Sequence, residues 1–190
     1  MPSQAGSWQR SCRVVQAMAR PRRFTPGGFV YHVFNRGSRK GVVFDTYEDY
    51  SGFVDLLDLT RAKSAMRIIA YCMMPTHFHL LLWPPGDTDV PAFMHRLTTA
   101  HAGKWHRVKN NVGTGAVYQS RYVSVGITSG QHYFTALRYV ERNALEAHLV
   151  QRAQDWPWCS ASQLVSECPT FRLDDGPCPR PNNWLECLND

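Results

Sequence analysis

Apolar residues recur along this chain with two different periods, and these periods predict its elements. The runs FVYHVF and MRIIAYCMM are rich in β-branched and aromatic residues, which is typical of strands. Other stretches repeat apolar residues every three or four positions, as around Phe53, Leu56 and Leu57, and predict helices. In chain order we expect a strand at 29–34, a helix at 45–65, strands at 66–74 and 77–83, a helix at 90–108, a strand within 113–127 and a helix at 130–150.

The order of these elements predicts an α+β fold of the ferredoxin-like, split βαβ kind. Such a fold has an antiparallel sheet with two helices packed on one face, and the third helix is an extra C-terminal element. Only Pro75 and Thr76 separate the second and third strands, so we expect an antiparallel hairpin there. The catalytic domain should span 26–150, between a flexible basic arm at 1–25 and a Pro-, Trp- and Cys-rich tail at 151–190 packed on the domain.

The third strand carries two histidines in an otherwise apolar run. Because strand side chains alternate, His77 and His79 share one face, whereas Phe78 and Leu80 point toward the helices. The histidines should then emerge on the open face of the sheet. Two neutral imidazoles two residues apart can reach one divalent metal ion. The alternative is a solvent-facing strand that happens to contain histidines.

Two classes of metal hydrolase with paired histidines are excluded. The H-x-H-x-D-H pattern of binuclear hydrolases needs an aspartate where this chain has Leu81, and the H-x-H-x-H pattern needs a histidine there. What remains is a mononuclear site whose other ligands come from elsewhere in the chain.

The helix at 130–150 contains candidate partners for the histidines. Its apolar stripe includes Leu137 and Val140, and at about 100° per residue Tyr139 and Asn143 project from roughly the opposite side, one turn apart. An amide oxygen can coordinate a metal ion, and a phenolate one turn away can attack phosphorus. A tyrosine that only packs in the core or on the surface is the alternative, and the residues alone leave both open.

The net charge of +6 is concentrated near the N-terminus. Residues 1–44 hold eight of the 21 basic residues and no acidic residue, whereas the remaining chain holds 13 basic and 15 acidic residues. Such an arm suits an anionic partner, most commonly nucleic acid. It also resembles an organelle transit peptide or a solvated tail.

No apolar run is long enough to span a bilayer, so we expect no membrane association. Without a secretory signal, we expect a cytoplasmic location, where the six cysteines are reduced thiols. The four cysteines near the C-terminus contain no C-x-x-C pair, and their spacing does not favour a structural zinc site.

Five motifs between residues 29 and 161 together resemble the single-tyrosine HUH transposases, and most closely the REP-associated tyrosine transposases. They are YHVFNRGSRK, AYCMMPTHFHLLLW, VYQSRYVS, RYVERNALEAHLV and DWPWCSAS. The resemblance implies His77, His79 and Asn143 as ligands of Mg²⁺ or Mn²⁺, and Tyr139 as the nucleophile. It also implies cleavage and rejoining of single-stranded or hairpin DNA through a 5′-phosphotyrosine intermediate. Family members commonly have glycine at the position of His148.

A single DNA strand requires a cationic track for its phosphates and flat side chains for its bases. Trp156 and Trp158 are candidates for stacking on bases or for anchoring the tail, and the basic face of the second helix could simply be solvated.

We expect the protein to be a monomer or a homodimer. The alternative to a transposase is a domesticated, sequence-specific nucleic-acid-binding protein without catalysis. The candidate DNA-binding residues are Arg20, Arg22, Arg23, Arg36, Arg39, Lys40, Arg96, Lys104, Gln119 and Arg121.

Overall fold

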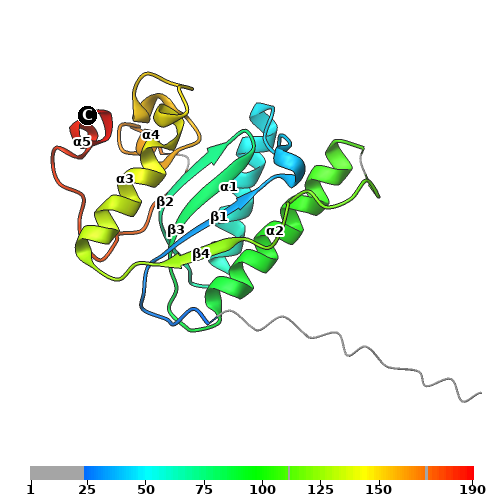
Figure 1. The fold of residues 1–190 in the computed structure, drawn as a ribbon, viewed down its shortest axis with the longest axis horizontal. Coiled ribbons are helices and arrows are strands. Elements are labelled where there is room, and N and C mark those ends of the chain that lie inside the picture. Colours follow the sequence, from blue (N-terminus) through cyan, green and yellow to red (C-terminus); the bar gives the residue numbers. More distant parts are fainter. Residues whose placement is uncertain (1–23, 111, 170) are drawn as a thin grey trace, which may run out of the picture.

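Four antiparallel strands form one sheet in the computed structural model, which describes residues 24–110, 112–169 and 171–190 (Figure 1). The strand order is β2-β3-β1-β4, the order that a split βαβ fold requires, so the expected fold class is confirmed. The main elements are β1 (Tyr31–Arg36), α1 (Tyr47–Ala62), β2 (Arg67–Met74), β3 (His77–Trp83), α2 (Asp89–Val108), β4 (Val123–Gly126) and α3 (Gly130–Glu146). Short elements are η1 (Ser38–Lys40), η2 (Ala153–Asp155), α4 (Ser160–Gln163) and α5 (Trp184–Asn189).

Local hydrogen bonds explain where several elements begin and end. Helix α1 starts after Thr46, whose side chain accepts from the backbone N–H of Asp49 while the Asp49 carboxylate accepts from that of Thr46. Helix α3 ends at Glu146 rather than at 150, because His148 has a φ of 55° and breaks the helical path. A glycine would adopt this left-handed conformation at less cost than a histidine.

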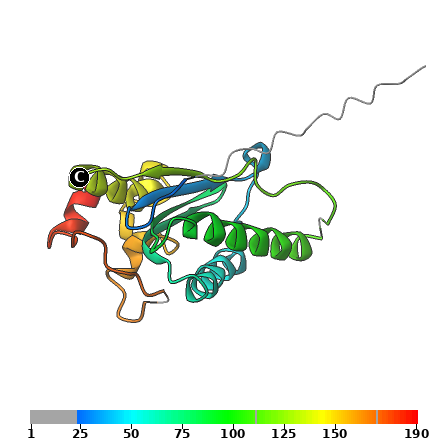
Figure 2. The ribbon, with the colours of Figure 1, turned by 90° about the horizontal axis from the view of Figure 1, so that it is seen from below.

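One face of the sheet is covered by α1 and α2, which lie side by side beneath it in Figure 2. Phe78 and Leu80 of β3 are fully buried in this core, together with Phe53 of α1 and Phe93 of α2. The expected packing of two helices on one face is therefore confirmed. No helix in the described part of the chain has the length and apolar composition needed to cross a bilayer.

Helix α3 packs on the opposite face of the sheet, mainly against β2 (Figure 2). A register irregularity between Ile68 and Ala70 places both Ile69 and Ala70 in the core beneath α3. The apolar stripe of α3, which includes Val140, completes this second core. The face that we expected to be open is thus partly covered, and β2 is buried on both sides.

Glu141 is a fully buried carboxylate that joins α3 to the C-terminal residues. It accepts hydrogen bonds from Ser160 Oγ (2.7 Å), Arg180 Nη2 (2.7 Å) and Trp184 Nε1 (2.6 Å). The same Arg180 nitrogen donates to the carbonyl of Ile69 in β2 (2.9 Å). These donors replace the water that the carboxylate loses on burial, so the charge can be accommodated inside the protein. The network connects α3, the sheet and the C-terminal residues.

We predict that Glu141→Ala lowers the free energy of unfolding by ~3–5 kcal/mol, because it breaks a buried network and leaves the partly buried Arg180 guanidinium without its counter-charge. Urea denaturation followed by circular dichroism measures this loss. The matched control is Glu146→Ala, since Glu146 lies on the same helix but has a 63% exposed side chain paired with Arg142. That exposed pair should contribute less than ~1 kcal/mol. Equal losses in the two variants would contradict the role of Glu141.

Candidate active site

Strand β3 directs His77 and His79 to the face on which α3 lies, and Phe78 and Leu80 to the other face. The alternation therefore places the two histidines together, as expected, and their ring centroids are 5.0 Å apart. The face is not open at this point, because His79 is only 4% exposed. Side chains from β1 and α3 cover it, since α3 packs across the sheet.

Helix α3 brings Tyr139 and Asn143 to these histidines. The Tyr139 ring centroid lies 5.5 Å from that of His79, with the rings edge to face. Asn143 forms a side-chain hydrogen bond with His77. Tyr139 remains 52% exposed, whereas the next residue, Val140, is fully buried. The phenol is thus held beside the histidines and is still accessible from solvent.

A third histidine, His32 of β1, belongs to this cluster and was missed by the sequence analysis. Its Nε2 lies 2.9 Å from Nδ1 of His79, and its ring centroid lies 5.6 Å from that of Tyr139. His32 belongs to the motif YHVFNRGSRK, but the sequence pattern assigned it no role in the site. The split βαβ strand order places β1 beside β3, and the alternation in β1 puts His32 and Phe34 on the same face. That combination could have indicated a neighbour for the β3 histidines.

Burial keeps the clustered imidazoles neutral near pH 7. It lowers the pKa of His79 to about 2, with smaller contributions from His32 and His77. Burial likewise lowers the pKa of His32 to about 4, and the nearby His132 lowers it further. A neutral imidazole keeps one nitrogen lone pair free, which is the form that binds metal ions. The site therefore offers unprotonated nitrogens at physiological pH.

The donor set fits a divalent metal ion with open coordination positions. Burial lowers the pKa of His77, and Arg36 acts in the same direction, while the hydrogen bond to Asn143 opposes them. In the described part of the chain, no three His, Cys, Asp or Glu side chains are grouped to hold a metal ion. A third ligand for such an ion, if drawn from the described residues, would be of another type. The amide oxygen of Asn143 is such a donor and lies next to His77.

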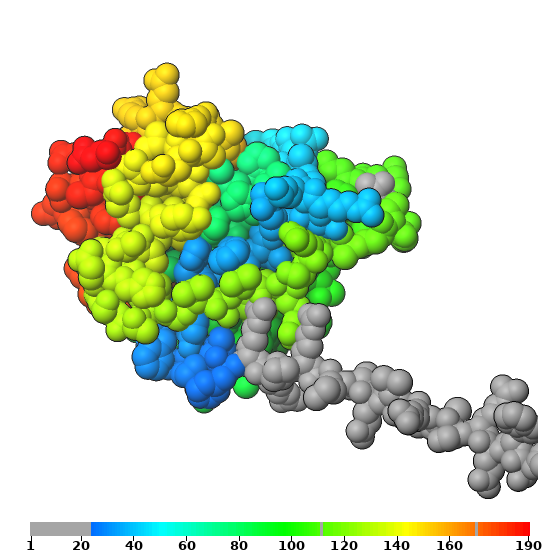
Figure 3. Space-filling view, viewed as in Figure 1, coloured from blue at the N-terminus to red at the C-terminus, as the bar shows by residue number. Residues whose placement is uncertain are grey.

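Part of the expected DNA-binding surface adjoins this cluster. Arg36 is exposed at the end of β1 and pairs with His77 across the sheet, and the Gln119 backbone N–H donates to the Arg36 carbonyl (2.9 Å). Arg39 and Lys40 are exposed in η1, directly after β1, and both have positive φ. Figure 3 shows the sheet still visible between α3 (yellow) and the segment with η1 (blue). Of these residues, Arg36 acts electrostatically on His77, whereas Gln119 and Arg39 each line a cavity shared with residues of α2.

The other expected DNA-binding residues lie apart from the histidines. Lys104 is half-buried against Gly52 of α1, on the face of the sheet opposite the site, and does not belong to this surface. Arg96 is exposed on α2, which lies on that same opposite face. Arg121 is exposed and lines a cavity of about 810 Å³ between α2 and residues 116–122. Arg20, Arg22 and Arg23, with most of the expected basic arm, lie outside the described residues.

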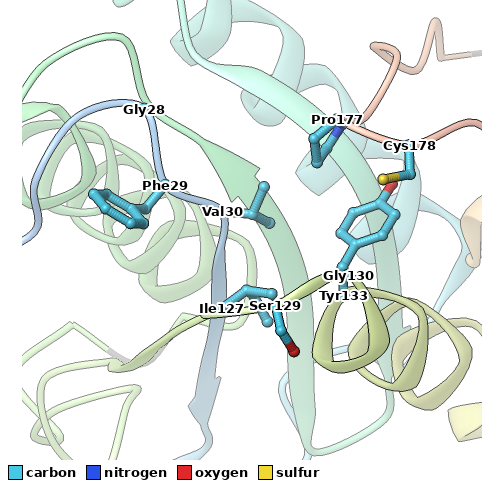
Figure 4. A pocket seen from close by; sticks show the side chains of 9 residues that line it. All are labelled: Gly28, Phe29, Val30, Ile127, Ser129, Gly130, Tyr133, Pro177 and Cys178. Atoms are coloured by element: carbon cyan, nitrogen blue, oxygen red, sulfur yellow. The ribbon is translucent and has the colours of Figure 1, made fainter.

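A smaller cavity of about 200 Å³ lies at the start of α3 (Figure 4). Val30, Ile127 and Tyr133 line it, and the Tyr133 phenol extends toward Cys178. None of the clustered histidines lines this cavity. Burial raises the pKa of Tyr133 to about 12, which makes its phenolate hard to form. Of the two tyrosines, only Tyr139 combines exposure with a place beside the histidines.

A known protein family and two solved structures are similar to this chain. The model of a family described as "Transposase IS200 like" matches residues 28–143, which is more than half of the chain. A structure of a REP-associated tyrosine transposase bound to a REP hairpin is similar, with a TM-score of 0.61 and 16% identity over 86% of this chain and 98% of that chain. A candidate transposase from Deinococcus radiodurans is 18% identical, with a TM-score of 0.46 over 69% of this chain and 92% of that chain. No curated protein matches the chain.

We predict that neither His32 nor His79 titrates near pH 6.5, the ordinary value for histidine. Because both pKa values are lowered by burial, the His32 midpoint should lie at about 4 and His79 should stay neutral to about 2 or until the protein unfolds. Histidine ring NMR signals followed against pH, in the metal-free protein, measure both midpoints. A midpoint near neutrality for either residue would show that the cluster is hydrated.

Proposed function

Since the chain belongs to the family of IS200-like transposases, we propose that it cleaves and rejoins single-stranded or hairpin DNA through a covalent bond to Tyr139. The observation that carries this proposal is the position of the half-exposed Tyr139 phenol beside His79, with Asn143 next to His77. All four side chains come from one chain, so we place the nucleophile and the metal ligands in the same molecule. The similar structure with a bound REP hairpin supports hairpin DNA as the substrate class.

The proposed reaction is a transesterification at phosphorus. The Tyr139 oxygen loses its proton and attacks the scissile phosphate, forming a 5′-phosphotyrosine bond. The bond from phosphorus to the 3′ oxygen breaks, and that oxygen takes up a proton to become a free 3′-OH. In the reverse direction a 3′-OH attacks the phosphotyrosine, so strands can be rejoined without an external energy source.

We propose that His77, His79 and Asn143 hold a Mg²⁺ or Mn²⁺ ion in this reaction. The ion would withdraw charge from the non-bridging phosphate oxygens as the new bond forms. The neutral histidines can act as ligands without first losing a proton, because burial has already lowered the pKa of each. Exposure of Tyr139 leaves room for a phosphodiester to approach from the solvent side.

We propose that Arg36, Gln119, Arg39 and Lys40 lead the DNA strand to this site. Arg36 ends β1 opposite His77, Arg39 and Lys40 follow in η1, and the Gln119 backbone N–H donates to the Arg36 carbonyl. Lysine and arginine side chains neutralise phosphates, and an exposed glutamine can donate to phosphate or base edges. Arg121 extends the same exposed segment as Gln119 and could contact a neighbouring nucleotide.

We predict that Tyr139→Phe abolishes the covalent protein–DNA adduct and leaves DNA affinity close to that of the wild type, because only the attacking oxygen is removed. The adduct is detected on denaturing gels after incubation with labelled hairpin oligonucleotides and Mn²⁺. The matched control is Tyr47→Phe, which removes an exposed phenol that lies against Trp158. An adduct that persists in Tyr139→Phe would refute the nucleophile. Binding without an adduct in the wild type would favour a nucleic-acid-binding protein without catalysis.

We predict that Arg36→Ala weakens binding of single-stranded DNA and reduces the slope of log affinity against log salt by about one, as the loss of one phosphate contact requires. Fluorescence anisotropy over a range of salt concentrations measures both quantities. Arg152→Ala is the control, because Arg152 is exposed but paired with Asp155. Equal changes in the two variants would remove Arg36 from the proposed DNA path.

A further inference from the structure

His32 and His79 form a packed imidazole pair inside the candidate site. The two ring planes are close to parallel, with centroids 5.1 Å apart and an angle of 23° between the planes. The nitrogens His32 Nε2 and His79 Nδ1 are 2.9 Å apart, which is the distance of a good hydrogen bond. Phe34 contacts both rings, with centroid distances of 5.4 Å and 5.5 Å. These contacts restrict the rotation of the His79 ring.

Only one tautomer of this pair leaves His79 able to bind a metal ion. The hydrogen bond between the two rings needs one donor nitrogen and one acceptor nitrogen, so one imidazole donates it and the other accepts it. If His32 Nε2 donates, Nδ1 of His79 accepts and Nε2 of His79 carries a proton, which leaves no free lone pair. If His79 Nδ1 donates to His32 Nε2, the lone pair on Nε2 of His79 is free.

We propose that His32 is a positioning residue that holds His79 in the tautomer with its proton on Nδ1 and thereby presents Nε2 to a divalent metal ion. This inference rests on the proposed function, because it assigns a role within the same site. Histidine ligands in proteins usually donate their second ring N–H to a fixed acceptor, which sets both the tautomer and the ring orientation. The acceptor here is a second imidazole, that of His32, which is itself partly buried.

Contacts of His32 with the remaining site residues suit this role. Its ring meets the edge of the Tyr139 ring at a centroid distance of 5.6 Å, so one side chain contacts both the nucleophile and a ligand of the proposed site. A residue that served only to fill the space between β1 and α3 could be apolar. Burying two imidazoles removes their water, and the hydrogen bond between them compensates for part of that cost.

The tautomer can be measured directly on the metal-free protein. Long-range ¹H–¹⁵N NMR spectra near neutral pH should show the proton of His79 on Nδ1. In His32→Gln the amide oxygen can take the place of Nε2 and accept the same hydrogen bond, so this tautomer should persist. In His32→Leu the acceptor is lost, and the Nε2–H tautomer that neutral histidine prefers in water should dominate. A proton on Nε2 of His79 in the wild type would overturn the proposal.

Metal affinity provides a second readout. By Mn²⁺ EPR, His32→Leu should bind Mn²⁺ ~10–100-fold more weakly than the wild type, as expected for the loss of a ligand's hydrogen-bond partner. His32→Gln should bind close to the wild type, and so should the control His132→Leu, since the His132 ring accepts from the Thr128 backbone N–H and acts on His32 only through its charge. Thermal unfolding of each variant checks that it is folded. Unchanged affinity in His32→Leu, or three coordinated imidazoles in pulsed EPR spectra of the wild type, would overturn the proposal.

The two proposals can fail separately. If the wild type forms no DNA adduct but His79 carries its proton on Nδ1 only when residue 32 can accept it, the catalytic function is refuted and the positioning of His79 stands. If the adduct forms and the His79 tautomer does not depend on residue 32, the positioning role is refuted and the catalytic function stands.

Discussion

The buried carboxylate of Glu141 is the interaction on which the arrangement of this site depends. It lies on α3 between Tyr139 and Asn143 in the sequence, and its donors come from the C-terminal residues. Arg180 extends the network to the Ile69 carbonyl in the sheet. A helix is rigid over one turn, so anchoring Glu141 inward fixes the direction in which Tyr139 and Asn143 project outward. The C-terminal segment thus determines site geometry although it supplies none of the clustered residues.

The two faces of the sheet have different roles, and the packing explains both. The face beneath α1 and α2 is an apolar core, in which Phe78 and Leu80 are fully buried. The other face is covered by α3 over β2 and remains accessible near the end of β1. His79 lies where the covered part of this face meets the accessible part, so that it is shielded from water but stays close to the exposed Tyr139. This placement keeps the imidazole neutral beside a phenol that solvent can reach, a combination that neither a buried core nor an open surface provides.

Sequence reasoning succeeded where a single element decides the outcome. The bounds of β3 and the common face of His77 and His79 followed from alternation along one strand. The buried stripe of α3 and the outward position of Tyr139 followed from helical periodicity. The prediction from sequence failed where a neighbouring strand sets the bounds of an element. Strand β1 extends to Arg36 rather than ending at 34, because its pairing with β3 continues to His77. It also missed His32 and Glu141, whose partners lie 47 and up to 43 residues away.

By itself, the sequence determined the order of the elements, the split βαβ fold and the faces on which His77, His79, Tyr139 and Asn143 lie. These features depend on backbone periods of two and 3.6 residues, which are constant in any context. The tertiary structure decided that α3 covers the second face, that this face is not open at His79, and that His32 accompanies it. It also decided that Lys104 packs against α1 instead of joining a DNA surface. These outcomes depend on which segments meet across long loops and which buried polar groups must find partners, and no local period contains that information.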